Sequence, residues 1–180
     1  DLLVAVAEAA LAGDDWSRAT TAADRASDIM RRQSRHVHRL HADLLALTAR
    51  AEAGLPAAPL LRRTERLIER LREAGAGELP QALVLGARLA GAVGSSRATA
   101  LRETWLGEAS AARRSSSARI RVLGWLALAQ HRELHSDLGG VLRACDLGLR
   151  TLDEHRATLG SQELRAVSSG HGARLAELGT

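Results

Sequence analysis

The chain has 180 residues, of which 46% are hydrophobic, so it can bury a core and is not intrinsically disordered. All 25 basic residues are Arg and, set against 21 acidic residues, they leave a formal net charge of only +4, with the two signs interleaved along the chain. This balance is typical of a solvated helical surface and argues against nucleic-acid binding, which favours a concentrated basic face.

Apolar residues recur three and four positions apart nearly from end to end, without the alternation expected of strands. The sequence therefore predicts an all-α fold in a single domain, residues 1–180. Breaks at Gly, Pro and capping residues divide the pattern into nine predicted helices, at about 1–12, 15–33, 35–53, 57–74, 79–94, 96–113, 117–133, 137–156 and 161–178. The first is too short to span a bilayer and lacks the basic flank of a signal peptide.

Several residues predict where these helices begin and end. Gly13 and Gly54 are expected to take the left-handed conformation that closes a helix, and Gly75 to Gly77 precede Pro80 at the start of the next one. Asp137 and Ser161 stand where N-caps are expected. The linkers are only a few residues long, so neighbouring helices should run antiparallel.

The spacing of the helix pairs predicts a repeat. The first helices of successive hairpins begin near 1, 36, 79, 117 and 161, about 35 to 44 residues apart, which favours pairs stacked as an α-solenoid. The small residues Ala19, Ala23 and Ala26, after Asp14 and Trp16, resemble the second helix of a tetratricopeptide repeat (TPR). The turn proline and the aromatics of that family are missing, so the resemblance is to a degenerate, TPR-like repeat. It implies that Ala19 and Ala26 are buried at a helix–helix contact.

A weaker TPR-like match follows in the fourth hairpin. It comprises Trp125, Leu128 and Ala129 on one helix and Gly148 on the next.

Two groups of histidines are candidate metal ligands. His36, His38 and His41 crowd the start of one helix, but Asp43 is the only adjacent carboxylate, so a complete site would need ligands from elsewhere. We expect these three imidazoles to be exposed.

His131 and His135 lie four residues apart, a spacing that places two imidazoles on one helix face. The segment reads HRELH, not HExxH, so Glu133 is misplaced to activate a metal-bound water between them. We expect this pair simply to end a helix, where partly protonated imidazoles interact favourably with the dipole of the helix C-terminus.

Cys145 is the only cysteine, which excludes an intrachain disulfide and favours a reducing compartment, the cytoplasm. His155 lies ten residues further along the same predicted helix, about 15 Å away along the axis, so the two cannot form a catalytic dyad. We expect Cys145 to pack in the core beside Val141 and Gly148.

Three other patterns have simple interpretations. Ser115 to Ser117 follow two arginines and suit either a basic-directed kinase or, as we favour, an interhelix turn in which a serine caps the next helix. No glycine lies in a phosphate-binding motif. Arginines alternate with acids on the predicted helix at 60–73, with a second basic string nearby, and both are interpreted as solvated faces: Arg62, Arg63, Arg66, Arg70 and Arg72, then Arg31, Arg32, Arg35 and Arg39.

The C-terminal run carries the most specific resemblance. The residues concerned are Leu152, Asp153, His155, Arg156, Ala157, Leu159, Gly160, Glu163, Leu164, Arg165, Ala166, His171, Gly172, Leu175, Ala176, Leu178 and Gly179. This run resembles the TPR-like helical-repeat region that precedes the caspase-like CHAT domain in actinobacterial CHAT-domain proteins. The resemblance implies a downstream His and Cys dyad that has no counterpart in this chain.

The resemblance and the repeat together predict a function. We expect a non-catalytic interaction or scaffold module without a cofactor, metal or catalytic residue, forming a regulatory part of a larger protein. Its partner would be a protein, a peptide or an intramolecular caspase-like domain, and it would not be a membrane. The start without Met and the stop just after a helical pattern favour a piece of a longer chain. The alternatives are a metal-dependent helical-bundle enzyme using the histidines and an Arg-rich helical array that binds nucleic acid.

Overall fold

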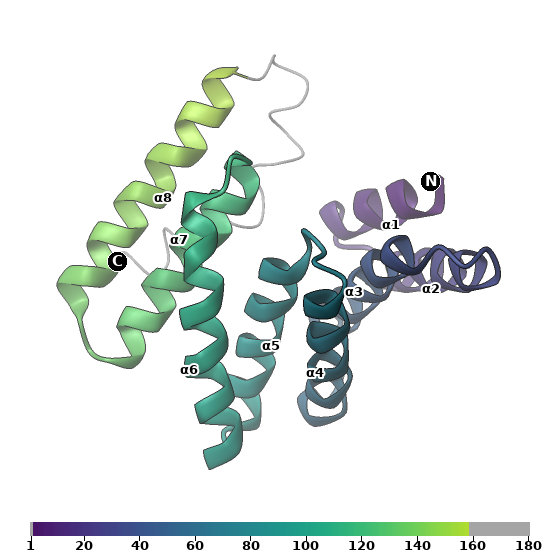
Figure 1. Ribbon diagram of the computed structural model, residues 1–180, viewed down its shortest axis with the longest axis horizontal. Coiled ribbons are helices and arrows are strands. Elements are labelled where there is room, and N and C mark those ends of the chain that lie inside the picture. The colour runs from purple at the N-terminus through teal and green to yellow at the C-terminus, as the bar shows by residue number, and fades with distance from the viewer. Residues whose placement is uncertain (1, 159–180) are drawn as a thin grey trace. The chain divides into compact units, whose positions relative to one another are not determined.

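The computed structural model describes residues 2–158, and over these residues all regular secondary structure is helical (Figure 1). The all-α prediction is confirmed for this part of the chain. The predicted helix at 161–178, with its Ser161 cap and most of the CHAT-like run, lies outside the described residues. The elements are α1 (Leu2–Ala12), α2 (Trp16–Arg32), α3 (His36–Glu52), α4 (Ala57–Glu73), α5 (Leu79–Val93), α6 (Ser96–Ser110), the 3₁₀ segment η1 (Ala111–Arg114), α7 (Ala118–Leu134) and α8 (Leu138–Thr158).

The chain divides into two compact units, with the division falling within α6. Unit 1 extends to Thr99 and unit 2 begins at Ala100. In unit 1, each of the helices α1 to α4 packs on the next one, and in addition α1 contacts α3 and α3 contacts α5. Helices α1, α3 and α5 therefore form one row, here called the α1–α3–α5 row.

Alanines form the contacts between the first three helices of unit 1. Ala19 of α2 packs with Ala10 of α1 and Ala49 of α3. Ala26 packs in the same way with Met30 and with Ala42 of α3. Both Ala19 and Ala26 are fully buried, as predicted. Since a methyl group is the largest side chain at most of these positions, the helix backbones approach closely and leave little room for a longer side chain.

One turn recurs between the helices of unit 1. In each copy a residue adopts a positive φ, and the N–H of the next residue donates to the carbonyl five positions earlier, as in a Schellman motif. The N–H groups are those of Asp15, Arg35, Leu55 and Ala76, and the left-handed residues before them are Asp14 (φ 58°), Ser34 (56°), Gly54 (75°) and Gly75 (59°). The left-handed positions lie 20, 20 and 21 residues apart.

The prediction for Gly54 is confirmed, and the prediction for Gly13 is wrong. Gly13 continues the helical hydrogen bonding, with its N–H 3.1 Å from the carbonyl of Ala9, and Asp14 takes the left-handed conformation instead. Aspartate tolerates this conformation better than most residues. Asp15 then caps α2, since its carboxylate accepts a hydrogen bond from the N–H of Arg18 at 3.0 Å.

Unit 2 is built from the second part of α6, η1, α7 and α8. Its core joins Val122, Leu126 and Ala129 of α7 to Val141 and Cys145 of α8. Asp137 caps α8 as predicted, accepting from the N–H of Gly140 at 2.8 Å.

The connection from α6 to α7 differs from the prediction. The helix expected at 96–113 ends as an α-helix at Ser110. The residues expected to form its last turn make up the 3₁₀ segment η1 instead. Gly124 lies directly against η1. A Cβ at this position would collide with the backbone of Arg113. Ser117 occupies the N-cap position of α7 but makes no side-chain cap bond, and its own N–H donates to the hydroxyl of Ser115 at 3.2 Å. The serines therefore form an interhelix turn, without the predicted side-chain cap.

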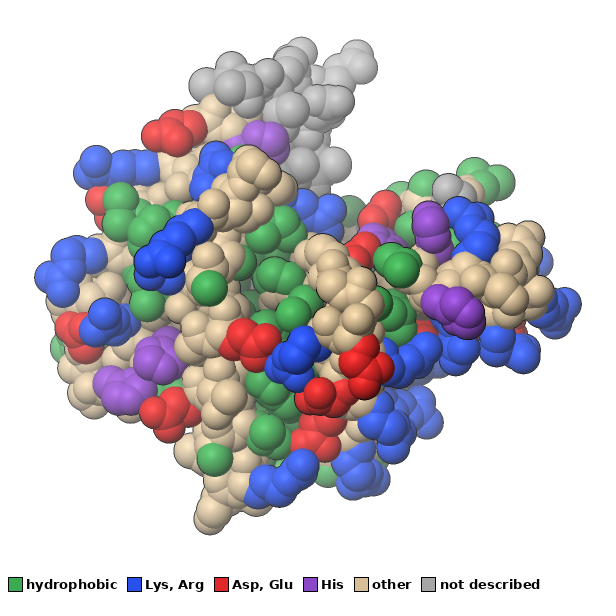
Figure 2. All heavy atoms as spheres, viewed as in Figure 1, with side chains coloured by type: hydrophobic (Ala, Val, Ile, Leu, Met, Phe, Trp, Pro, Cys, Tyr) green, Lys and Arg blue, Asp and Glu red, His purple; other side chains and the backbone are tan. Residues whose placement is uncertain are grey.

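Charged side chains are interspersed on the surface, and Figure 2 shows acidic groups lying among the arginines on the visible face. Within unit 1, ion pairs join different helices: Arg50 of α3 with Asp24 of α2 and Arg88 of α5 with Glu52 of α3, both at 2.6 Å, and Arg97 of α6 with Glu65 of α4 at 2.8 Å. On α4, Arg72 pairs with Glu69 at 2.8 Å. The predicted apolar face of α4 is buried throughout, from Leu60 to Leu71. Within residues 2–158, none of the helices combines the length and apolar character needed to cross a membrane.

Candidate functional site: a polar groove and a histidine cluster

His41 lies at the centre of the α1–α3–α5 row. Its Nδ1 atom is 3.0 Å from Oε1 of Glu78, which immediately precedes α5, and its Nε2 atom is 3.3 Å from Oε1 of Glu8 on α1. Because an ionised carboxylate only accepts hydrogen bonds, Nδ1 donates to Glu78. One half-buried imidazole on α3 therefore links α1 to the start of α5.

A groove of about 250 Å³ opens beside this imidazole. Its apolar lining comes from Val4, Met30 and Val37, and its polar lining from Glu8, His38, His41 and Glu78. Val37 is 46% exposed, so the groove presents an apolar surface to the outside. Apolar walls beside two carboxylates suit an apolar side chain followed by a cationic one.

The three histidines at the start of α3 do not converge. His36 and His38 are exposed, as expected, whereas His41 is only partly accessible, so the expectation is wrong for His41. The two carboxylates contact opposite nitrogens of the His41 ring, and one metal ion cannot bind both nitrogens of a single imidazole. Asp43 is engaged by the hydroxyl of Ser27 and by Arg39 and Arg70, at 3.7 and 3.6 Å.

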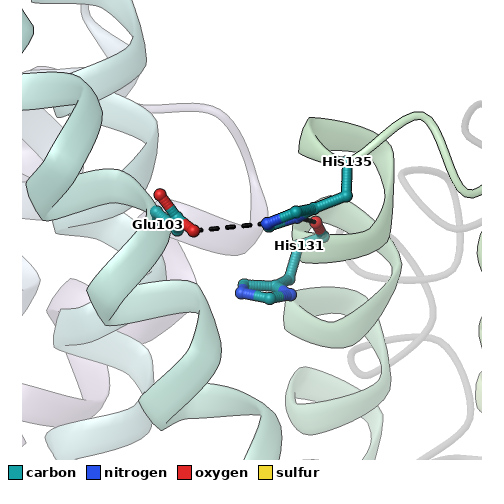
Figure 3. Close-up of side chains that lie close together, drawn as sticks. All are labelled: Glu103, His131 and His135. Atoms are coloured by element: carbon teal, nitrogen blue, oxygen red, sulfur yellow. Dashed lines mark hydrogen bonds and ion pairs between the residues drawn. The ribbon is translucent and has the colours of Figure 1, made fainter.

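A second cluster, in unit 2, joins α6 to α7 (Figure 3). His131 and His135 project from α7 towards α6, and Glu103 projects from α6 to face them. One ligand atom from each of the three side chains lies within 4.8 Å of the others. The closest approach, 3.2 Å, is between Nε2 of His135 and Oε1 of Glu103.

Neighbouring groups set the charge of this cluster. Burial lowers the pKa of His131. The nearby His135 and Arg132 lower this pKa further, whereas Glu103 raises it. The lowered pKa favours the neutral form of the His131 imidazole. Arg132 also pairs with Asp137 at 3.1 Å.

The structure places the two histidines where the sequence predicted, at the end of α7, with His135 as its C-cap. Glu133 is outside the cluster and lies 3.9 Å from Arg102, so it does not complete a hydrolase-type site. Glu103 was not predicted. It precedes His131 by 28 residues and belongs to no motif, so only the packing of α6 against α7 reveals it.

Cys145 is a core residue, as predicted. It is 3% exposed and packs with Val141 and Val122, and burial raises the pKa of its thiol. A buried thiol that resists ionisation is a poor nucleophile. His155 lies further along the same helix, α8. The role of Cys145 is therefore packing.

Comparisons with protein-family models, curated proteins and solved structures find no significant match to this chain. The groove of unit 1 and the cluster of unit 2 are therefore the observations from which a function can be proposed.

Proposed function

We propose that the chain is a non-catalytic, TPR-like helical-repeat module that binds a protein or peptide along the α1–α3–α5 row. The observation that carries this proposal is the recurrence of one turn at Asp14, Ser34, Gly54 and Gly75. Equal joints at nearly equal intervals generate stacked helix pairs, and stacked pairs form a solenoid whose alternate helices share one face. The contacts of α3 with both α1 and α5 support this arrangement.

The groove beside His41 supports one class of ligand. Val4, Met30 and Val37 offer an apolar surface, and Glu8 and Glu78 place negative charge at its edge. A peptide with an aliphatic or aromatic residue next to Arg or Lys complements both properties. The paired arginines elsewhere in unit 1 make a nucleic acid a poorer candidate, because their charges are balanced locally.

The CHAT resemblance supports a regulatory setting for this module. In that setting, a cytoplasmic actinobacterial protein would carry a caspase-like domain after these helices, and partner binding on the row would control it. Most of the residues that carry the resemblance lie beyond Thr158, outside the described residues. The reading frame downstream of Thr180 tests this part directly. A caspase-like segment with a His and Cys dyad would support it, and any other continuation would end the CHAT assignment and leave the interaction module.

The binding row itself can be tested with two matched variants. Val37→Ser removes apolar surface from the groove, while Leu55→Ser removes it from the connection between α3 and α4, at a position with the same exposure of 46%. Peptides selected from a random display library on the 180-residue chain provide the ligand. Their dissociation constants are measured by fluorescence polarisation.

We expect selected peptides to combine an apolar residue with Arg or Lys. Val37→Ser should weaken their binding about tenfold, about 1.4 kcal/mol, because an apolar contact is lost, whereas Leu55→Ser should leave it unchanged. Circular dichroism verifies that both variants fold. Failure to select any peptide, or an equal effect of the two variants, would remove the groove from the proposal.

A further inference from the structure

We infer that Glu103, His131 and His135 form a binding site for a divalent transition-metal ion, that Zn²⁺ is the ion best suited to it, and that the ion ties α6 to α7. The site lies in unit 2 and does not depend on the function proposed for unit 1. It also revises the expectation from the sequence that the two histidines merely end a helix.

The distances fit a metal with small adjustments. Ligand atoms about 2.0–2.1 Å from a tetrahedral zinc ion lie roughly 3.3 Å from one another. The 3.2 Å separation between His135 and Glu103 already meets this requirement. The two imidazole centroids are 4.8 Å apart, with the rings inclined at 33°, so a modest side-chain rotation of His131 completes the set.

A backbone hydrogen bond orients His135 for this role. Its Nδ1 atom lies 2.9 Å from the carbonyl oxygen of His131. A carbonyl can only accept, so Nδ1 carries the hydrogen and the Nε2 atom faces Glu103. Such support of the second ring nitrogen is common among metal-binding histidines, because it fixes both the tautomer and the ring orientation.

The space at His131 is also suitable. The residue facing its ring on α6 is Gly107, where an added Cβ would lie 3.6 Å from Nε2. The lack of a side chain there leaves room beside the imidazole.

The ligand types select the ion. Two imidazoles and one carboxylate suit zinc, whereas Mg²⁺ and Ca²⁺ prefer oxygen ligands. Three protein ligands leave a fourth position for water. Glu133 is paired with Arg102 and takes no part in the site. Glu103 and His135 are about half exposed, so an ion can reach the site between the two helices from solvent.

Zinc titration of the untagged, metal-free 180-residue chain tests the inference. Isothermal calorimetry should give one strong site per chain, and Zn²⁺ should raise the melting temperature. Co²⁺ should give the visible absorption of a four-coordinate site. His135→Asn and Glu103→Gln should each weaken Zn²⁺ binding at least tenfold, whereas His38→Asn, which removes an exposed histidine from unit 1, should leave it unchanged.

Circular dichroism of each variant separates loss of a ligand from loss of the fold, and two variants on different helices guard against one failing to fold. The inference is overturned by either of two results. One is the absence of stoichiometric Zn²⁺ binding at micromolar concentration. The other is binding that His38→Asn weakens as much as His135→Asn does.

Discussion

Unit 1 and unit 2 join their helices in different ways. Unit 1 uses the same turn after α1, α2, α3 and α4, whereas unit 2 uses it once among its described residues, after α7, where Ser136 has a φ of 56°. Between α6 and α7 the chain instead passes through η1, which lies across Gly124. The regular unit provides a continuous row of helices, and the irregular one brings Glu103 close to two histidines. Regularity thus suits an extended surface, and a break in it suits a localised polar site.

The largest effect is expected at Gly124, where the irregular connection is most tightly packed. Gly124→Ala puts a methyl group into the backbone of η1, so either η1 or α7 must shift. We expect a loss of about 3 kcal/mol in the free energy of unfolding, at the upper end of the usual range for overpacking. Urea unfolding followed by circular dichroism measures it. Gly107→Ala is the control, because its added Cβ makes only ordinary contacts. Equal stability of the two variants would contradict this account of η1.

In unit 1 the corresponding weak point is the alanine contact between α1, α2 and α3. Ala19→Leu should cost roughly 1–3 kcal/mol by overpacking, while Ala12→Leu, at an exposed position, should change little. Unit 1 contains Trp16, and unit 2 contains Trp105 and Trp125. In a background with Phe at 105 and 125, the fluorescence of Trp16 reports unit 1 directly. An unchanged midpoint for Ala19→Leu would mean that the alanine contact is not as tight as described.

The shared turn allows a smaller test in both units. Ser34→Gly and Ser136→Gly relieve a left-handed conformation that costs a non-glycine residue roughly 1–2 kcal/mol. The gain is reduced by the extra freedom of glycine in the unfolded chain, so we expect each variant to be more stable by up to about 1 kcal/mol. Gly54→Ala should have the opposite sign. Denaturant midpoints of the three variants measure the effect, and destabilisation by both serine variants would show that the serines favour this turn.

The smallest effect concerns Cys145 and alkaline pH. Its folded-state pKa is raised above the ordinary value of 9.0, so the folded chain holds the thiol proton more tightly than the unfolded chain. Unfolding then releases a proton, and stability contributed by the buried thiol is lost as pH rises above 9.0. Urea midpoints measured between pH 8 and pH 10 should therefore fall less in Cys145→Ala than in the parent chain. Parallel curves for the two proteins would contradict the assignment.

Much of the fold could be predicted from the sequence, because helix starts and stops depend on local signals. The helices match the predicted ranges to within a few residues, and the alternation on α4 gave its buried face residue by residue. Left-handed residues were predicted only where glycine marks them, correctly at Gly54 and wrongly at Gly13. Asp14, Ser34 and Ser136 adopt the same conformation without that mark. Periodicity also does not distinguish the 3₁₀ turn of η1 from a last turn of α-helix.

The candidate sites were predictable only in part. Histidines four residues apart are visible in any helical sequence, so His131 and His135 were found. Glu103 comes from another helix, and Glu8 and Glu78 reach His41 from 33 and 37 residues away along the chain. Each of these carboxylates becomes a neighbour only through helix packing. Local patterns therefore identified the histidines of the candidate sites, and the tertiary fold identified the carboxylates beside them.

The turn repeated at Asp14, Ser34, Gly54 and Gly75 also governs how such a protein can change in length. Each joint requires one left-handed residue and backbone hydrogen bonds, and it does not depend on side chains of the helix that follows. A helix pair of about forty residues could be duplicated or deleted between two joints without disturbing the bonds of the others. Duplication or deletion of whole hairpins can therefore lengthen or shorten the α1–α3–α5 row, and with it the length of the surface that the row presents.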